Sequence, residues 1–320
     1  MYLALFRELC SRGVIPKSPA GKAYGVWKDV YDYVHEKLFG KVGSPVPTVP
    51  KGTELAAKFK VSIVELELKY GLAATARKEL AGYLDTHLDE LHEKINLVAE
   101  LTNEATKCPV LFVVEGTDKT DTTRAREIFS GHTNALTTFQ AAAIYTFPIT
   151  LAYSTEFNQL KTAFDQRFAL PNLKLSNHDG SNNAEGKGSM RTIILERIDP
   201  GADLVDRESL DLFVGASGGV VLSIIRLVQQ AAVHAISRGS ACIEKEDAAY
   251  AITQERGDFV RVLDTSDYPI LKERHGDKVL SSDGNVQRLL HCLALLEYEN
   301  DVPWCDVHPI VLPLVQERAT

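Results

Sequence analysis

The segment from Pro109 to Lys119 constrains the fold of this 320-residue chain more than any other stretch. It opens with the apolar run Pro109-Val-Leu-Phe-Val-Val114 and ends in the acidic turn Glu115-Gly-Thr-Asp118. A short apolar run without alternation predicts a strand that is buried on both faces, as in the centre of a parallel sheet. Carboxylates at the carboxyl end of such a strand lie where open α/β sheets bind their ligands.

A hydrophobic strand followed by acidic residues is also the layout of a Walker B element. There, one carboxylate holds the Mg²⁺ of a nucleotide and a second polarises water. The simpler alternative is a buried strand followed by a solvated turn. The segments on either side of the run help to distinguish a nucleotide site from a solvated turn.

The surrounding sequence alternates predicted helices with apolar strands, which favours a parallel α/β sheet. A long amphipathic helix is expected over Thr75–Thr106, and Asp121 is expected to cap a helix that runs to about Ser130. The further expected helices are Tyr2–Cys10, Gly25–Phe39, Phe139–Ile144, Phe157–Phe168 and Arg191–Arg197. The further expected strands are Val61–Lys69, Thr146–Ser154, which is also expected to be buried, and the short Asn172–Ser176.

From Ser209 onward the pattern is helical, with helices expected at Ser209–Ala216, Val220–Ser237 and Glu246–Arg256. The last segment, Asp258–Thr320, predicts three helices and then a hairpin whose strands flank the turn at Asn300-Asp301. That order is typical of a winged helix. The sequence thus predicts an α/β core over residues 1–200, a helical lid over 201–256 and a winged helix over 257–320.

Together these segments resemble an AAA+ or origin-recognition-like P-loop ATPase of the type found in bacterial conflict and signalling proteins. The resemblance runs from about Leu66 to the end of the chain. Its most specific parts are Glu115-Gly-Thr-Asp-Lys119, Phe147-Pro-Ile-Thr-Leu-Ala-Tyr-Ser154, Ser217-Gly-Gly219, and Leu296-Glu-Tyr-Glu-Asn300 with Trp304 and Val307-His-Pro309. It implies a P-loop NTPase-like core, ATP and Mg²⁺ as cofactors, and ATP hydrolysis coupled to partner binding.

The resemblance also implies roles for particular residues. Glu115 stands at the position of the metal-associated acid, which is usually an aspartate, and Asp118 stands where a second acid could orient the attacking water. Ser154 ends the strand that carries the polar sensor 1 residue. Gly218 and Gly219 open the helix that carries sensor 2.

Three arginines are candidates for further roles in this resemblance. The arginine that commonly follows the Gly-Gly pair is replaced here by Leu222, and Arg226, one helical turn further, is the candidate substitute. Arg191 and Arg197 are candidates for an arginine finger that acts on a neighbouring subunit. For each of the three, the alternative is a charge on a helix surface.

One element of the resemblance is missing from the sequence. A P-loop ATPase holds the β- and γ-phosphates with backbone amides and the lysine of Gly-x-x-x-x-Gly-Lys-Ser/Thr, and no segment matches that motif. The nearest is Gly180-Ser-Asn-Asn-Ala-Glu-Gly-Lys-Gly188, which has the wrong spacing and lies in the expected mobile loop Asn177–Ser189. The first strand and the phosphate loop are therefore expected upstream of Met1.

Composition and charge leave two classes of function open: a regulatory ATPase, and a nucleotide-independent interaction module on an ATPase-like scaffold. DNA binding by the winged helix is disfavoured, because the net charge is −8 and residues 258–320 hold six basic and eleven acidic residues. A protein partner is expected to contact the lid and winged helix, and homo-oligomerisation stays open.

The five scattered cysteines predict neither zinc binding nor disulfides and favour a cytoplasmic location. The sequence offers no membrane-spanning run.

Overall fold

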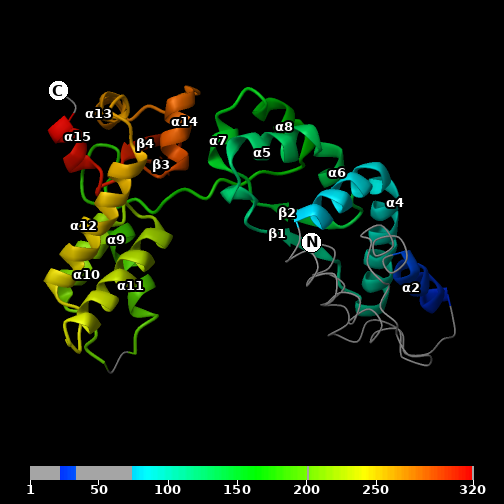
Figure 1. The fold of residues 1–320 in the computed structure, drawn as a ribbon, viewed down its shortest axis with the longest axis horizontal. Coiled ribbons are helices and arrows are strands. Elements are labelled where there is room, and N and C mark those ends of the chain that lie inside the picture. Colours follow the sequence, from blue (N-terminus) through cyan, green and yellow to red (C-terminus); the bar gives the residue numbers. More distant parts are fainter. Residues whose placement is uncertain (1–21, 34–73, 200–201, 319–320) are drawn as a thin grey trace. The chain divides into compact units, whose positions relative to one another are not determined.

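The computed structural model describes residues 22–33, 74–199 and 202–318. The fold in these ranges is mostly helical, with one small parallel sheet and one C-terminal β-hairpin (Figure 1). The chain divides into two compact units, Met1–Phe147 and Pro148–Thr320, called here the N-terminal unit and the C-terminal unit. Each unit is considered by itself. The expected helix Tyr2–Cys10, the expected strand Val61–Lys69 and the end of the expected helix Gly25–Phe39 lie outside the described residues.

The N-terminal unit places a two-stranded parallel sheet among helices. Its elements are α2 (Lys22–Asp32), α4 (Ala74–Thr106), β1 (Leu111–Val114), η2 (Thr117–Lys119), α5 (Thr122–Arg126), the π-helical η3 (Glu127–Gly131), α6 (Thr133–Thr137) and β2 (Ala142–Tyr145). The Asp121 side chain accepts a hydrogen bond from the Arg124 backbone N–H, which confirms the predicted cap. The long helix predicted before the first strand is confirmed as α4, with a kink at His87, whose φ of −128° and ψ of 23° are not helical.

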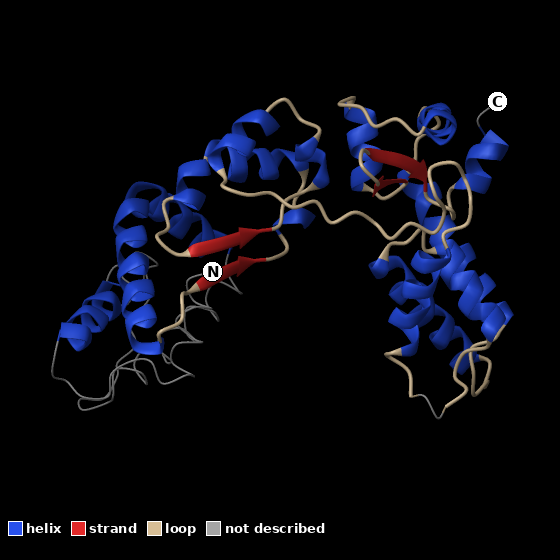
Figure 2. Cartoon of the chain, turned by 180° about the vertical axis from the view of Figure 1, so that it is seen from behind, coloured by secondary structure: helices blue, strands red, loops and turns tan. Residues whose placement is uncertain are grey.

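The predicted strand after Pro109 is confirmed as β1, and it pairs in parallel with β2 from Leu111–Ala142 to Val114–Tyr145 (Figure 2). The expectation that both its faces are buried was wrong. Phe112 is buried, with its ring 5.9 Å from the ring of Phe139, but Leu111 and Val113 on the other face are 53% and 55% exposed. Among the described residues the sheet is therefore covered on one face.

The second strand lies earlier in the chain than predicted. Thr146–Ser154 was expected to be a strand and Phe139–Ile144 a helix, whereas β2 covers Ala142–Tyr145 and α7 covers Ile149–Ala152. Pro148 precedes α7 in an extended conformation. Because proline cannot donate to a sheet ladder and its φ suits the start of a helix, it separates the strand from the helix.

The C-terminal unit is a helical assembly that carries a hairpin. Its elements are α7, α8 (Phe157–Ala163), α9 (Ala184–Leu195), α10 (Arg207–Ala216), α11 (Val221–Ser237), α12 (Lys245–Val262), α13 (Asp267–Asp277), α14 (Gly284–His291), β3 (Leu295–Glu299), β4 (Pro303–Val307) and α15 (Leu312–Arg318). The helices predicted between Ser209 and Arg256 are confirmed, and the antiparallel pairing of β3 with β4 confirms the hairpin. Of the three helices predicted between Asp258 and the hairpin, two are confirmed as α13 and α14, and the first is the end of α12 and not a separate helix.

One apolar core extends through most of the C-terminal unit. It includes Met190 of α9, Phe213 of α10, Ile224 of α11, Leu289 of α14 and Val307 of β4, all at most 4% exposed. The helix α12 runs across residue 256, where the predicted lid was expected to end. The division into a separate lid and winged helix stays a prediction.

The predicted loop Asn177–Ser189 is partly helical, since α9 begins at Ala184. The Asn183 side chain accepts a hydrogen bond from the Gly186 N–H at 2.8 Å, so this asparagine is the N-cap of the helix. A Cβ on Gly186 would lie 1.9 Å from the Lys174 carbonyl oxygen, which explains a glycine in the first turn. The expected strand Asn172–Ser176 is reduced to a single bridge between Ser176 and Asn182.

Candidate functional site

The carboxyl ends of β1 and β2 meet at one edge of the parallel sheet. The sequence predicted a candidate ligand site at the carboxyl end of the first of these strands. After Val114 the chain turns at Gly116, whose φ of +85° is a left-handed conformation that favours glycine. The turn leads into η2, and Asp118 lies in its middle. Apart from Gly116 and its two neighbours in the chain, no atom of the described residues lies within 4 Å of a Cβ built on Gly116, so this side of the turn is open.

Thr146, directly after β2, ties the two strand ends together. Its backbone N–H donates to the Val114 carbonyl at 3.1 Å, which extends the ladder by one bond. Its hydroxyl donates to Asp118 Oδ1 at 2.9 Å, and its carbonyl accepts a hydrogen bond from the Thr117 hydroxyl. The carboxylate of Asp118 is thereby held beside the end of β2, three residues after the exposed Glu115. We call Glu115, Thr117, Asp118 and Thr146 the carboxylate edge.

The carboxylate edge offers oxygen atoms only, two carboxylates and two hydroxyls. Mg²⁺ prefers oxygen ligands and commonly uses one or two carboxylates together with water and phosphate oxygens. The described residues contain no group of three or more His, Cys, Asp and Glu side chains placed to hold a metal ion. The donor set therefore fits a Mg²⁺ that takes further ligands from water or a bound phosphate. The triphosphate itself would need further donors, because the sequence has no phosphate-binding loop motif.

The other predicted site residues lie in the C-terminal unit. Ser154 comes after α7, and its hydroxyl donates to the Leu151 carbonyl at 2.9 Å. It does not end a strand, which was the basis for assigning it to sensor 1. The residue that does follow the second parallel strand is Thr146.

Gly218 and Gly219 form a tight turn between α10 and α11, with φ of +61° and +80°. The Tyr298 hydroxyl donates to the Gly218 carbonyl at 2.7 Å. A Cβ on Gly219 would lie 1.7 Å from the Leu173 carbonyl oxygen, and one on Gly218 would lie 2.4 Å from a Leu296 methyl carbon. Packing and backbone conformation thus account for both glycines, and their predicted role at a cofactor stays a prediction.

Two of the three predicted arginines lie on helix surfaces, and Arg197 lies in the turn that follows α9. Arg226 is exposed on α11. Arg191 of α9 forms a partly exposed ion pair with Asp211 of α10 at 2.5 Å. Arg197 donates to the Ile193 carbonyl of the preceding turn at 2.7 Å. These contacts account for Arg191 as a helix-surface residue and for Arg197 as a residue of the turn after α9, and their predicted role as arginine fingers stays a prediction.

Sequence reasoning missed Thr117 and Thr146 at the carboxylate edge. The signal for Thr146 was present, because it follows the apolar run Ala142-Ala-Ile-Tyr145 and precedes Pro148 by two residues. Assigning that run to a strand would have placed Thr146 at its carboxyl end. Thr117 lies inside the acidic turn, and only the paired strands reveal its contact with Thr146.

The chain was compared with protein-family models, with curated proteins and with solved structures. None of these comparisons found a match. Within the described ranges no helix is both long and apolar enough to cross a membrane.

Proposed function

We propose that this chain is an AAA+-like regulatory module in which the carboxylate edge forms the Mg²⁺ side of an ATP site. The observation that carries the proposal is the hydrogen bond from Thr146 to Asp118, which joins the ends of two adjacent parallel strands. It matches the arrangement that the sequence resemblance implies, with an acid after one strand and a polar sensor after its neighbour. Here Thr146 takes the sensor position in place of Ser154.

Within this proposal, Glu115 and Asp118 supply oxygen ligands to Mg²⁺, directly or through water, and Thr146 fixes the orientation of Asp118. Hydrolysis also requires amides and a lysine at the β- and γ-phosphates, and the sequence lacks the motif that provides them. We therefore assign the carboxylate edge a role in binding Mg²⁺·ATP. Hydrolysis would depend on a phosphate loop that this sequence does not contain.

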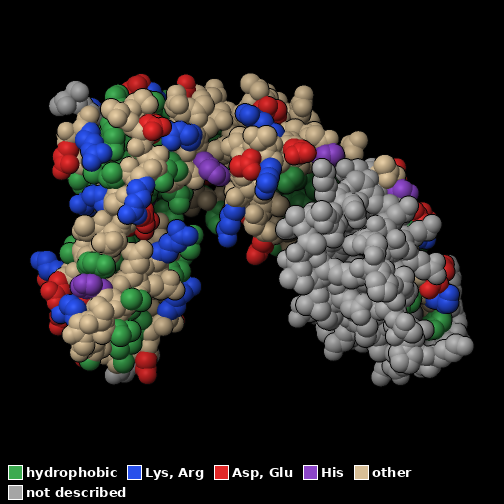
Figure 3. Space-filling view, in the orientation of Figure 1, with side chains coloured by type: hydrophobic (Ala, Val, Ile, Leu, Met, Phe, Trp, Pro, Cys, Tyr) green, Lys and Arg blue, Asp and Glu red, His purple; other side chains and the backbone are tan. Residues whose placement is uncertain are grey.

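The proposal extends to the C-terminal unit as the part that contacts a protein partner. Its helices α12, α13 and α14 followed by the β3–β4 hairpin have the order of a winged helix. Binding of nucleic acid is the weaker alternative, because residues 258–320 carry an excess of five acidic residues. On the face in view in Figure 3, acidic side chains lie among the basic ones of this unit.

A second candidate function is a nucleotide-independent interaction module. It is favoured by the absent phosphate-loop motif and by the packing of the Gly218–Gly219 turn, where both glycines are explained without a cofactor. Under this alternative the carboxylate edge is a solvated turn, and partner binding does not respond to ATP.

Binding of a fluorescent ATP analogue, measured with Mg²⁺ and with excess EDTA, separates the two candidates. The proposal predicts Mg²⁺-dependent binding that weakens about 10-fold or more in Asp118→Asn, because a charged ligand to the metal is lost. Glu127→Gln, an exposed carboxylate of the same unit, is the matched control and should leave the affinity unchanged. Absence of Mg²⁺-dependent binding, or equal affinities in the two variants, would favour the interaction module.

A further inference from the structure

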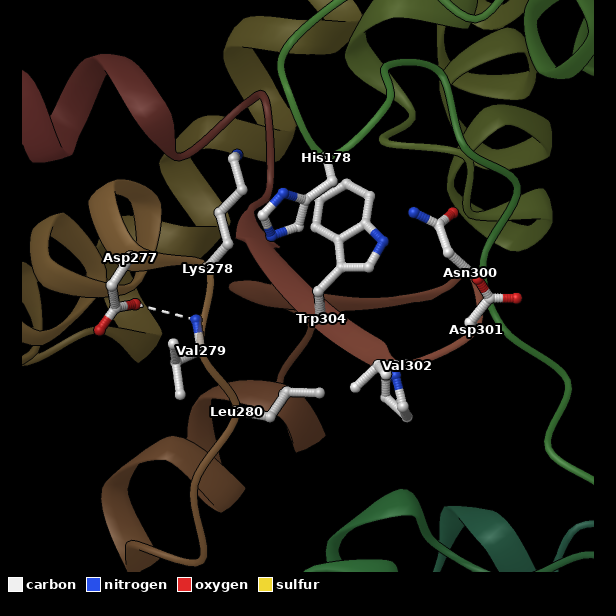
Figure 4. Close-up of a pocket in the computed structure, with 10 residues that line it drawn as sticks. His178, Asp277, Lys278, Val279, Leu280, Asn300, Asp301, Val302 and Trp304 are labelled. Atoms are coloured by element: carbon white, nitrogen blue, oxygen red, sulfur yellow. Dashed lines mark hydrogen bonds between the residues drawn. The ribbon is translucent and has the colours of Figure 1, made fainter.

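The C-terminal unit contains a groove beside the turn of its hairpin, with a volume of about 510 Å³. One wall is the segment that follows α13, the opposite wall is the hairpin turn, and His178 lies at one end (Figure 4). Lys278, in a left-handed conformation with φ of +58°, ends α13 and directs the chain along β4. Its carbonyl accepts a hydrogen bond from the Cys305 N–H at 3.0 Å, which fixes this wall against the hairpin.

The walls of the groove expose apolar side chains to solvent. Val302 in the hairpin turn is 71% exposed, Val279 in the opposite wall is 52% exposed, and Leu280 follows it. Exposed apolar groups that face one hollow from two segments form a surface on which an apolar side chain can be buried.

Trp304 packs beside the same hollow and reports on its occupation. Its side chain is buried, and its indole Nε1 has no hydrogen-bond acceptor among the described residues. Figure 4 shows the indole nitrogen directed toward Asn300, whose Oδ1 accepts instead from Lys174 Nζ at 2.5 Å. Because this nitrogen is itself buried, a ligand in the groove does not bond to it, but the NMR signal of the indole N–H responds to a ligand that packs nearby.

The charges at the groove favour a basic ligand. Its lining holds the carboxylates of Asp277 and Asp301 and a single cation, Lys278. Lys278 is neutralised by Asp306 at 2.5 Å, and its Nζ lies 5.5 Å from the centre of the Trp304 ring. Asp277 is paired with Arg274, whereas Asp301 lies exposed in the hairpin turn. Asp301 is therefore the carboxylate best placed to meet a ligand cation.

We propose that this groove binds a short extended peptide segment of a partner protein, with an aliphatic or aromatic residue next to a lysine or arginine. The apolar side chain packs against Val279, Leu280 and Val302, and the basic residue pairs with Asp301. This inference rests on the proposed role of the C-terminal unit in partner binding and names the surface and the class of partner.

The test is a titration of the full chain with Ac-Lys-Leu-Phe-Lys-NH₂, followed by the indole N–H signals in ¹H–¹⁵N NMR. The chain has two tryptophans, and the signal that persists in Trp27→Phe belongs to Trp304. The basic peptide should shift the Trp304 signal in a saturable way, and Ac-Glu-Leu-Phe-Glu-NH₂ should bind at least about 10-fold more weakly. A Trp304 signal unmoved at millimolar peptide, or equal binding of the two peptides, would overturn the proposal.

Two variants and one control locate the binding surface. Val302→Ser should weaken binding about 10-fold, because it removes apolar surface from the wall without adding a charge, and Asp301→Asn should weaken it about 3-fold. The control is Val233→Ser on α11, since Val233 is 69% exposed, nearly the same as Val302. Equal effects of Val302→Ser and Val233→Ser would contradict the assigned surface.

The same samples, assayed for binding of Mg²⁺·ATP, separate this inference from the proposed function. Peptide binding without ATP binding would support the peptide groove and contradict the proposed role in ATP binding. ATP binding without peptide binding would contradict the peptide groove and leave the proposed role in ATP binding unaffected.

Discussion

Two glycine turns, which the sequence resemblance assigns to one nucleotide site, differ in their surroundings. Gly116 follows β1 in an open turn, where a Cβ would have no atom within 4 Å among the described residues other than its own chain neighbours. Gly218 and Gly219 precede α11 in a closed turn, where a Cβ on either glycine would collide with Leu296 or with the Leu173 backbone. The open turn leaves space for a ligand, whereas the closed turn is filled by the protein itself.

This difference shows that a glycine motif can have two physical causes. Both turns need a positive φ, which glycine adopts without strain. Only the closed turn also requires residues without a side chain, because β3 and the 172–175 segment pack directly on it. The predictions that follow test this contrast, from the largest expected effect to the smallest.

The closed turn should be the most sensitive position of the two. Gly219→Ala should lower the free energy of unfolding of the C-terminal unit by about 3 kcal/mol or more, because it adds backbone strain to a collision with Leu173. Urea denaturation followed by circular dichroism measures the change. The control is Gly215→Ala in α10, where the Cβ has space and helix propensity favours alanine. A loss below about 1 kcal/mol for Gly219→Ala would mean that the turn is not closed.

Packing next to the closed turn should also make the C-terminal unit sensitive to acid. His308 is buried 5.2 Å from the Phe259 ring, and its Nδ1 accepts a hydrogen bond from the Ile310 N–H. Burial lowers the pKa of His308 from 6.5 to about 4. Because the unfolded chain binds this proton first, stability should be lost as pH falls from about 6.5 to about 4, by about 3 kcal/mol in all.

Urea denaturation at several pH values, compared between the wild type and His308→Asn, isolates this contribution. The wild type should lose about 3 kcal/mol more than His308→Asn between pH 7 and pH 4. His291→Asn, at an exposed position of α14, is the control and should follow the wild type. Parallel pH profiles of the wild type and His308→Asn would contradict the assigned burial.

The open turn should tolerate a side chain much better. Gly116→Ala should cost about 1 kcal/mol, from the left-handed backbone alone, and Gly116→Asn should cost less, because asparagine adopts this conformation more readily. Denaturation curves of the two variants and the wild type measure the difference. If Gly116→Ala lowered the free energy of unfolding as much as Gly219→Ala, the proposed difference between the two turns would be contradicted.

The sequence predicted the helices from Ser209 onward well because they are long and have clear boundaries. Asp206 caps α10, Glu244 and Asp247 form a capping box at α12, and Asp283 caps α14, all visible as acidic residues before apolar periodic runs. The hairpin was predictable from apolar runs on both sides of Asn300-Asp301. Periodicity and caps are local, so they can be read without knowledge of tertiary contacts.

The N-terminal unit was harder to predict, because its strands are four residues long. Ala142-Ala-Ile-Tyr145 fits a helix or a strand equally well, and pairing with β1 decides the outcome. A similar ambiguity affected Asn183, because asparagine is typical both of loops and of helix N-caps. The carboxylate edge was therefore predicted through Glu115 and Asp118, while Thr146 required the register of the sheet.

A double-mutant cycle on Asp118 and Thr146 tests most directly whether the carboxylate edge is the Mg²⁺ side of an ATP site. Mg²⁺-dependent ATP binding is measured for the wild type, Asp118→Asn, Thr146→Val and the double variant. Because Thr146 acts by orienting Asp118, Thr146→Val should weaken binding in the wild type and have little further effect in Asp118→Asn. Additive losses, or wild-type binding in Thr146→Val, would contradict the account.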